Sequence, residues 1–295
     1  MNQAVLPETI ADAPSAPPRN AGSSIGKLLL DSGKITPENA ERVLRLQKEA
    51  GIRFGEAAQR LGLITEDDIK EVLARQFDYP YVQPGLGNFA KTLVAAYQPH
   101  GPQVETLRAV RSQLMLRWFA RGRKALVIVS VNPEDGASMF AANLAVVFSQ
   151  LGEQTLLVDG NLRTPQQQEI FGLKAPQGLS DALAGRAGLD AVAKIASFVD
   201  LSVLTAGTLP PNPQELLSRN TFGALNQQLE EKFDVVLYDV AAFTSGADAL
   251  AIAARAGGAL LVARKNQTAL EDIAVLSEQL VRSGVEIVGT VLQDF

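Results

Sequence analysis

The sequence SVNPEDGASMFAANLA, residues 130–145, joins an apolar run to a helical pattern through a short loop that contains one glycine. The run before it, residues 125–129, is apolar throughout, as in a strand buried on both faces of a sheet. Gly136 and Ser138 stand where a phosphate-binding loop has its last glycine and the hydroxyl that reaches magnesium. The residues predicted to bind nucleotide are Gly136, Ala137, Ser138 and Met139.

This loop lacks the charge that phosphate binding normally uses. Ala137 stands in the place of lysine, and Glu134 in the place of the first glycine. The missing ammonium would neutralise the terminal phosphates, and an opposite charge at about 4 Å contributes roughly 4 kcal/mol at an effective dielectric of about 20. Glu134 and Asp135 are expected to place carboxylates near the phosphates and to repel a triphosphate. A bound diphosphate or an empty loop is compatible with these residues.

Strand and helix patterns alternate from residue 124 to the end of the chain. Strands are predicted at residues 124–131, 154–159, 201–206, 234–239, 258–263 and 286–292. The alternation predicts an α/β fold, with a mostly parallel sheet covered by helices on both faces. Asp159 and Asp239 end two of these strands, where carboxylates hold magnesium or position water. With Ser138 they form a predicted weak magnesium site; the alternative is that they cap the turns that follow.

The N-terminal part contains one unit used twice. Residues 24–47 read SIGKLLLDSGKITPENAERVLRLQ, and residues 53–76 read RFGEAAQRLGLITEDDIKEVLARQ. Each unit predicts a short helix, a glycine turn and a second helix. Gly33 and Gly62 are expected in the left-handed conformation that ends a helix. Thr36 and Thr65 are expected to cap the next helices through their hydroxyls, without a complete capping box.

These units resemble the paired motifs in the N-terminal domain of type II secretion and type IV pilus assembly ATPases. Some of those domains bind cyclic di-GMP, so the resemblance implies the same ligand here, with a pure interaction module as the alternative. The second unit matches the family's motif well, whereas the first begins with Ser24 in the place of arginine. The residues implied are Gly26, Leu44, Gln47, Arg53, Phe54, Gly55, Leu73 and Gln76.

The composition and net charge of the chain argue against several classes of function. The 295 residues are 46% hydrophobic and carry a formal net charge of -5, which gives no electrostatic footprint for DNA or RNA. The chain has no cysteine and one histidine, His100, which argues against disulfides, thiolate zinc sites and a Ser-His-Asp triad. His100, between Pro99 and Gly101, is expected to be a solvated turn residue. No apolar run reaches the roughly 20 residues that span a bilayer.

The domain boundaries follow from these patterns. Residues 1–21 are rich in Pro, Ala and Asn, resemble no signal peptide and are predicted to be a disordered tail. Residues 22–85 form the repeat domain, 86–103 a linker with one short helix, and 104–295 the nucleotide-binding domain. Residues 104–120 predict an amphipathic helix on which Glu105, Arg108 and Arg111 are accessible together. A cytoplasmic location is expected.

Several motifs occur in a fixed order: the loop at 133–139, DGNLRTP at 159–165, GLSDALAG at 178–185, AGTLPPNPQELL at 206–217 and VVLYD at 235–239. Together they resemble the cytoplasmic domain of bacterial tyrosine kinases that control polysaccharide chain length, especially the EpsG-type proteins of exopolysaccharide biosynthesis. The resemblance implies ATP or ADP with Mg²⁺ as cofactors and a membrane polysaccharide chain-length or export protein as partner, which would recruit the chain to the inner face of the membrane. It also implies oligomerisation through Glu105, Arg108 and Arg111.

The chain departs from that family at the residues that carry out phosphoryl transfer. Besides Ala137, Asn161 replaces an aspartate, and Ala241 and Ala242 replace prolines. The last residues, GTVLQDF, have no tyrosine cluster. These losses predict a non-catalytic regulator of exopolysaccharide synthesis or export, and the repeat resemblance implies that cyclic di-GMP gates it. The alternatives are an active tyrosine autokinase that recruits Arg163 or a neighbouring subunit for the missing charge, and a relative of septum-positioning or partition ATPases.

Overall fold

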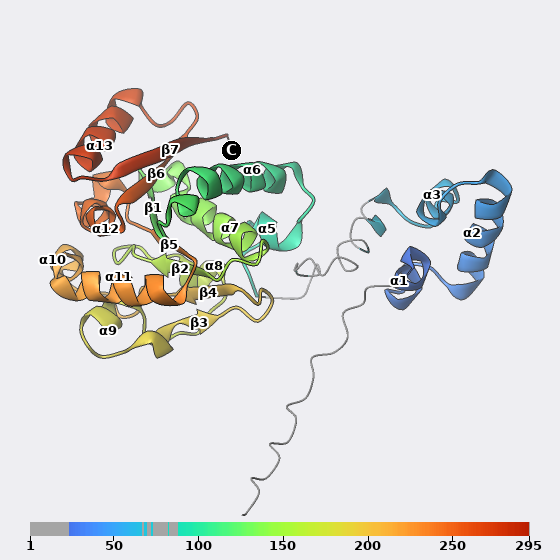
Figure 1. Ribbon diagram of the computed structural model, residues 1–295, viewed down its shortest axis with the longest axis horizontal. Helices are drawn as coiled ribbons and strands as arrows, with labels where there is room; N and C mark the ends of the chain where they lie inside the picture. The colour runs from blue at the N-terminus through green and yellow to red at the C-terminus, as the bar shows by residue number, and fades with distance from the viewer. Residues whose placement is uncertain (1–23, 67, 70–71, 73–81, 83–87, 295) are drawn as a thin grey trace, which may run out of the picture. The chain divides into compact units, whose positions relative to one another are not determined.

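The computed structural model describes residues 24–66, 68, 69, 72, 82 and 88–294, and the chain divides into two compact units, Met1–Tyr79 and Pro80–Phe295 (Figure 1). Among the described residues, the smaller unit has one hydrophobic cluster and the larger unit has two. Among the described helices, none is long and apolar enough to cross a bilayer. Each unit therefore has a core of its own.

The smaller unit is helical, with α1 at Ile25–Asp31, α2 at Pro37–Ala50 and α3 at Phe54–Arg60. Gly33 and Gly62 end helical turns with φ of 69° and 66°, which confirms the predicted left-handed turns. Thr36 caps α2 by accepting from the Asn39 N–H at 3.2 Å. The expectation of hydroxyl caps alone was wrong for the second unit. Asp68 reaches back to the Thr65 N–H at 2.8 Å while its own N–H donates to Thr65 Oγ1 at 3.2 Å.

The larger unit is built on a seven-stranded sheet in the order β3-β4-β2-β5-β1-β6-β7. The strands are β1 Ala125–Ser130, β2 Thr155–Asp159, β3 Ala193–Lys194, β4 Leu201–Leu204, β5 Val235–Asp239, β6 Gly258–Arg264 and β7 Glu286–Gln293. All neighbouring pairs are parallel except the pair of β3 with β4. The six predicted strands are confirmed, and the two-residue β3 is an addition that has too few residues to leave a periodic signal.

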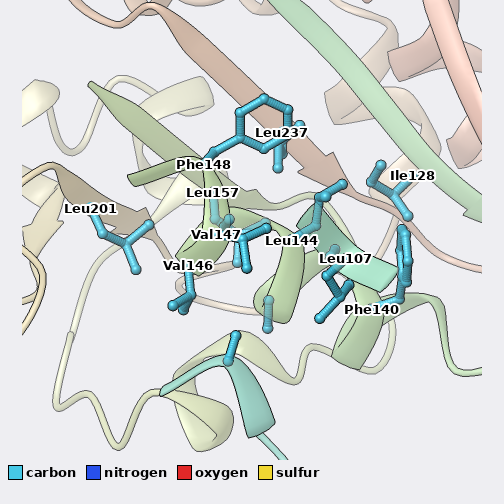
Figure 2. Close-up of a cluster of buried hydrophobic side chains, with 14 of the residues drawn as sticks. Leu107, Ile128, Phe140, Leu144, Val146, Val147, Phe148, Leu157, Leu201 and Leu237 are labelled. Atoms are coloured by element: carbon cyan, nitrogen blue, oxygen red, sulfur yellow. The ribbon is translucent and has the colours of Figure 1, made fainter. Parts of the chain in front are cut away.

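Helices cover both faces of the sheet, as predicted (Figure 1). Alternate residues of β1 enter different clusters: Leu126 and Ile128 face α7, whereas Val127 faces the opposite layer. Figure 2 shows the first cluster, in which side chains of α7 such as Leu144 and Phe148 meet strand residues. The helices are α5 Val94–Tyr97, α6 Pro102–Arg117, α7 Ala137–Ser149, α8 Gln167–Ile170, α9 Leu179–Leu183, α10 Pro213–Ser218, α11 Asn220–Lys232, α12 Asp248–Ala256 and α13 Leu270–Arg282.

The segment expected to be a linker is packed into the larger unit over its described residues 88–103. Leu93, Ala95 and Ala96 are fully buried in the same cluster as α7. The Ala95 N–H donates to Asn143 Oδ1 at 2.9 Å. Four prolines between residues 77 and 103 suggested a linker, whereas the short apolar run at Leu93–Ala96 decides its packing.

Candidate functional site

The phosphate-binding loop connects β1 to α7 at the carboxyl edge of the sheet. A single turn of 3-10 helix, Pro133–Asp135, leads to Gly136 at φ 81°, and α7 begins at Ala137. Gln293 at the end of β7 donates through Nε2 to the carbonyls of Asp135 at 3.2 Å and Gly136 at 3.3 Å. The end of β7, two strands away from β1 in the sheet, thus holds the loop backbone.

The Asp135 side chain turns into its own loop, so the expectation that it would repel a phosphate was wrong. Its side chain is buried, and its carboxylate accepts from the Asn132 N–H at 2.9 Å and from Thr268 Oγ1 at 2.7 Å. The carboxylate therefore closes its own turn and ties it to the segment after β6. Glu134 remains exposed, so it is the acid that can still repel an anion at this loop.

Ser138, Asp159 and Asp239 come together as predicted from the strand ends. Ser138 Oγ donates to Asp239 Oδ1 at 3.0 Å, and Asp159 lies opposite Asp239 in the register of β2 with β5. Asp159 Oδ2 also accepts from the backbone N–H groups of Gln166 at 3.1 Å and Gln167 at 2.9 Å. Asp159 therefore fills the capping role, and it also lies beside Asp239, where the sequence predicts a cation.

Asp159 and Asp239 are unfavourable as two buried negative charges side by side. Both are fully buried. Burial raises the pKa of Asp159, and the charge of Asp239 raises it further. Burial also raises the pKa of Asp239, against the hydrogen bonds from Gln167 and Ser138. A positive charge between them would relieve this repulsion. Among the described residues, no group of three or more His, Cys, Asp or Glu side chains could hold a metal by itself.

Gln167 is the site residue that sequence reasoning missed. It is fully buried at the first position of α8, and its Nε2 donates to Asp239 Oδ2 at 2.8 Å and to the Ser138 carbonyl at 3.0 Å. The sequence offered one weak signal, since residues 166–168 are all glutamine and helical turning buries only the middle one.

Arg163 is engaged elsewhere. Its guanidinium makes a two-pronged contact with Asp248 at the start of α12, with Nε to Oδ2 at 2.6 Å and Nη2 to Oδ1 at 3.1 Å. Asn161, which replaces an acid, organises the turn at residues 161–164: its Oδ1 accepts from the Thr164 N–H at 3.0 Å. The residue that was the intramolecular candidate for the missing cation thus serves an ion pair.

Met139, the last predicted loop residue, is half-buried against the α7 cluster, and its carbonyl accepts from Asn143 Nδ2 at 3.0 Å. Ala137 is buried in the first turn of α7, with 5% of its surface exposed. The predicted loop residues therefore include one hydroxyl and no cation.

In the smaller unit, the two repeat glycines lie at contacts between the repeats. A Cβ on Gly26 would lie 3.2 Å from the ring of Phe54, and one on Gly55 would lie 3.8 Å from Ile25 Cδ1. Ile25 and Phe54 are equivalent positions, so each repeat places a side chain against the other's glycine. Arg53 and Leu44 are exposed and Gln47 is half-buried, whereas Leu73 and Gln76 lie outside the described residues.

The predicted oligomerisation residues lie on α6 but differ in exposure. Glu105 is exposed and pairs with Arg108 one turn later. Arg111 donates through Nη1 to the Val147 carbonyl of α7 at 2.5 Å. The structure thus uses Arg111 within the fold and leaves Glu105 as the most accessible member.

Comparisons with solved structures place this fold beside bacterial kinase domains. The chimerical protein CapA2B2 is 32% identical with a TM-score of 0.64, covering 78% of this chain and 98% of that one. The kinase domain of Escherichia coli tyrosine kinase ETK is 28% identical with a TM-score of 0.66, covering 68% of this chain and 79% of that one. The cell division ATPase MinD of Pyrococcus furiosus has a TM-score of 0.51 at 28% identity, covering 58% of this chain and 71% of that one. The P-loop fold is shared by all three.

Sequence relatives give the family. No protein-family model matches the chain. A putative tyrosine-protein kinase in the cps region of Klebsiella pneumoniae is 28% identical over 257 residues, which cover 85% of this chain and 35% of that protein. This chain therefore spans about a third of that relative. Tyrosine-protein kinase YwqD of Bacillus subtilis is 31% identical over 202 residues, 68% of this chain and 85% of YwqD. On this similarity, the chain belongs to the bacterial tyrosine-protein kinase family.

Proposed function

We propose that this chain acts in capsule or exopolysaccharide synthesis, as an EpsG-type protein that docks on a membrane chain-length or export protein. The name of the Klebsiella relative, which places it in a cps region, supports the pathway. The docking partner follows from the same family resemblance, and it would bring the chain to the inner face of the membrane. This chain would then act as a cytoplasmic component of the export assembly.

The catalytic part of the proposal is that this chain does not transfer phosphoryl groups itself. The observation that carries it is Ala137, a methyl group in the first turn of α7 where a phosphate-neutralising cation is needed. Arg163 is held by Asp248, and Glu134 adds an exposed negative charge to the loop. The domain would keep the kinase fold for docking on the membrane export protein, but it would no longer transfer phosphoryl groups.

The residues present still fit a magnesium ion. Ser138 Oγ and the carboxylates of Asp159 and Asp239 are the hard oxygen ligands that Mg²⁺ prefers, and Mg²⁺ usually takes few protein ligands together with waters and phosphates. When bound, the ion would supply positive charge to phosphate oxygens. Ser138 and Asp239 would hold it, and the Asp159 carboxylate, fixed by two backbone N–H groups, would keep its place beside them.

An active kinase is the second candidate. It is favoured by the names of the relatives, which are tyrosine-protein kinases, and by the intact contact of Ser138 with Asp239. Its own substrate tyrosines are few. Tyr238 is buried in β5 and donates to Asn226 Oδ1 at 2.6 Å, and Tyr97 donates to the Phe89 carbonyl at 3.1 Å. Tyr79 and Tyr81 lie outside the described residues.

Phosphotyrosine immunodetection after incubation with ATP and Mg²⁺ separates the two candidates. The expected result is no phosphotyrosine on the chain and no ATP turnover above a blank, with or without a membrane partner's cytoplasmic segment. Turnover that disappears in Asp239→Asn would refute the non-catalytic proposal and establish the active kinase.

Gating by cyclic di-GMP is the proposal for the smaller unit. It rests on the repeat resemblance and on the exposed Arg53 that precedes α3. The contacts of Gly26 and Gly55 are equally well explained by packing between repeats, so a binding measurement is needed. Calorimetric titration of the full chain with cyclic di-GMP is expected to give binding that Arg53→Ala weakens and Arg60→Ala, a nearby exposed arginine, leaves unchanged. Absence of heat at high micromolar ligand would remove this role.

A further inference from the structure

The amide of Gln167 lies inside the acidic site rather than beside it. Its Nε2 contacts Asp239 Oδ2 at 2.8 Å and the Ser138 carbonyl at 3.0 Å, and its backbone N–H contacts Asp159 Oδ2 at 2.9 Å. Gln167 therefore contacts the carboxylates of Asp159 and Asp239 and the backbone of Ser138, and its side chain has no exposed surface.

The other end of this amide lacks a partner. Among the described residues, Gln167 Oε1 is one of two buried side-chain atoms without a hydrogen bond. A buried acceptor without a donor is costly, and native structures rarely keep one unless water, an ion or a functional role explains it.

The orientation of the amide is fixed by its neighbours. A rotated amide would place Oε1 against Asp239 Oδ2 and the Ser138 carbonyl, which are both acceptors. The oxygen therefore points away from those two atoms, while its side chain remains within the site.

Among the described residues at this site, Ser138, Asp159, Asp239 and Arg163 offer no spare donor for Oε1 when a cation is bound. Ser138 Oγ already donates to Asp239 Oδ1, and Asp159 and Asp239 can only accept once a cation keeps both of them ionised. Arg163 donates to Asp248. The donor must then be a group that the carboxylates themselves attract.

We propose that Gln167 is an outer ligand of a hydrated divalent cation at Ser138, Asp159 and Asp239, accepting through Oε1 a hydrogen bond from a metal-bound water. Mg²⁺ gives up its waters reluctantly and commonly keeps several of them, so a site with few protein ligands needs acceptors for those waters. Nε2 has a separate task, which is to hold Asp239 and the loop at Ser138 in position. The inference deepens the proposed function at the same site, but it holds whether or not phosphoryl transfer occurs.

The test uses Mn²⁺ as a paramagnetic probe, titrated into the full chain and followed by electron paramagnetic resonance of the free ion. Gln167→Met keeps the length of the side chain and removes both amide atoms. Loss of an outer ligand is expected to weaken Mn²⁺ binding about 10- to 100-fold. Gln168→Met, at the exposed neighbour on α8, is the matched control and should bind as the wild type does.

Gln167→Glu distinguishes an outer ligand of the cation from a residue that only positions Asp239. It keeps an oxygen at the position of Oε1, adds negative charge and loses the Nε2 donor, so an outer ligand role predicts Mn²⁺ binding at least as tight as in the wild type. If Gln167→Glu binds as weakly as Gln167→Met, the residue only positions Asp239 and the proposal is wrong. Equal affinity of Gln167→Met and the wild type would also overturn it, as would absence of Mn²⁺ binding by the wild type across the millimolar range. Circular dichroism checks that each variant is folded, and the phosphotyrosine assay reports separately on the proposed function.

Discussion

Residue 137 is an alanine where a phosphate-binding loop carries its lysine. Ala137 opens α7, whose first N–H groups favour an anion even without a side-chain cation. Gln293 holds the loop backbone through the Asp135 and Gly136 carbonyls, so the shape of the loop does not depend on a lysine. What is missing is charge, and charge can be restored.

Ala137→Lys is expected to tighten ATP binding about 10-fold or more, because a new cation near the phosphates outweighs the exposed Glu134. Phosphotyrosine should stay absent, since Glu134 and Asn161 remain. Titration with a fluorescent ATP analogue measures the affinity. Ala109→Lys adds the same charge on the exposed face of α6 and should leave affinity unchanged. Unaltered affinity in Ala137→Lys would mean that the loop does not present its N–H groups to phosphate.

The ion pair of Arg163 with Asp248 contributes to stability because one partner is completely buried. Asp248 has no exposed surface, while the Arg163 side chain is 36% exposed. Arg163→Met should lower the free energy of unfolding by about 3 kcal/mol, by leaving a carboxylate buried without its partner. Arg282→Ala, which removes an exposed pair with Glu278, should change it by less than about 1 kcal/mol. Urea unfolding of the variants measures both, and equal small effects would contradict the assigned role of Arg163.

Asp181 makes the two signatures at 178–185 and 206–217 pack together, and it predicts a pH dependence. Desolvation disfavours its charge, but hydrogen bonds from Thr208, Arg186 and the Gly178 N–H outweigh it and lower the pKa from 3.8 to about 2. Because the folded pKa is depressed, the stabilisation is complete above about pH 4 and is lost as the pH falls through 2.

Asp181→Asn should therefore destabilise the protein by roughly 2 kcal/mol at neutral pH, and the gap to the wild type should narrow between pH 4 and pH 2. Chemical unfolding at a series of pH values measures the gap. A gap that stays constant over this range would show that the charge of Asp181 is not what matters.

At the scale of elements, the sequence predicts the strands and turns, which follow from the periodic pattern of apolar residues and from glycines. It misses the features that depend on contacts between residues far apart in the chain. Six strands were recognised because their apolar runs are long and bounded by turn residues. The glycine turns at Gly33 and Gly62 were recognised because few other residues adopt positive φ. The inward turn of Asp135 was missed because its partner Thr268 is distant in sequence. Gln167 was missed because burial of a polar side chain depends on the elements packed around it.

The contact between α6 and the sheet gives a test at this scale. Trp118, which follows α6, is fully buried and donates through Nε1 to the Ala125 carbonyl at 2.9 Å. A Cβ on Gly258, at the start of β6, would lie 2.3 Å from its ring. Gly258→Ala should therefore cost about 1–3 kcal/mol through overpacking.

Gly289→Ala is the matched control in the neighbouring strand β7, because its Cβ would meet Leu260 at an ordinary 3.6 Å. Its expected effect is within about 0.5 kcal/mol. Urea denaturation followed by tryptophan fluorescence reports directly on Trp118, the one tryptophan of the chain. Equal effects of the two substitutions would mean that the ring moves aside without cost.

At the scale of the whole molecule, the chain combines two cores that share no residue. The described core of the smaller unit lies between Leu29 and Val72, and the two clusters of the larger unit begin at Val82. The segment at residues 88–103 adds Leu93, Ala95 and Ala96 to the larger core. A division placed at residue 103 would therefore cut through a packed layer, whereas one placed after Tyr79 would not.

Deletion of residues 1–79 should consequently leave the larger unit folded, because the described apolar side chains of its two clusters all lie at residue 82 or beyond. The midpoint of its thermal transition should shift by less than about 4 °C, the change that 1 kcal/mol produces in a domain of this size. Deletion of residues 1–103 removes the buried Leu93, Ala95 and Ala96 as well and leaves Asn143 Oδ1 without the Ala95 N–H. That second fragment should lose several kcal/mol or fail to fold. Scanning calorimetry of the two fragments beside the full chain measures the difference. Equal stability of both fragments would mean that the segment at 88–103 is a linker after all, and that the core of the larger unit begins at α6.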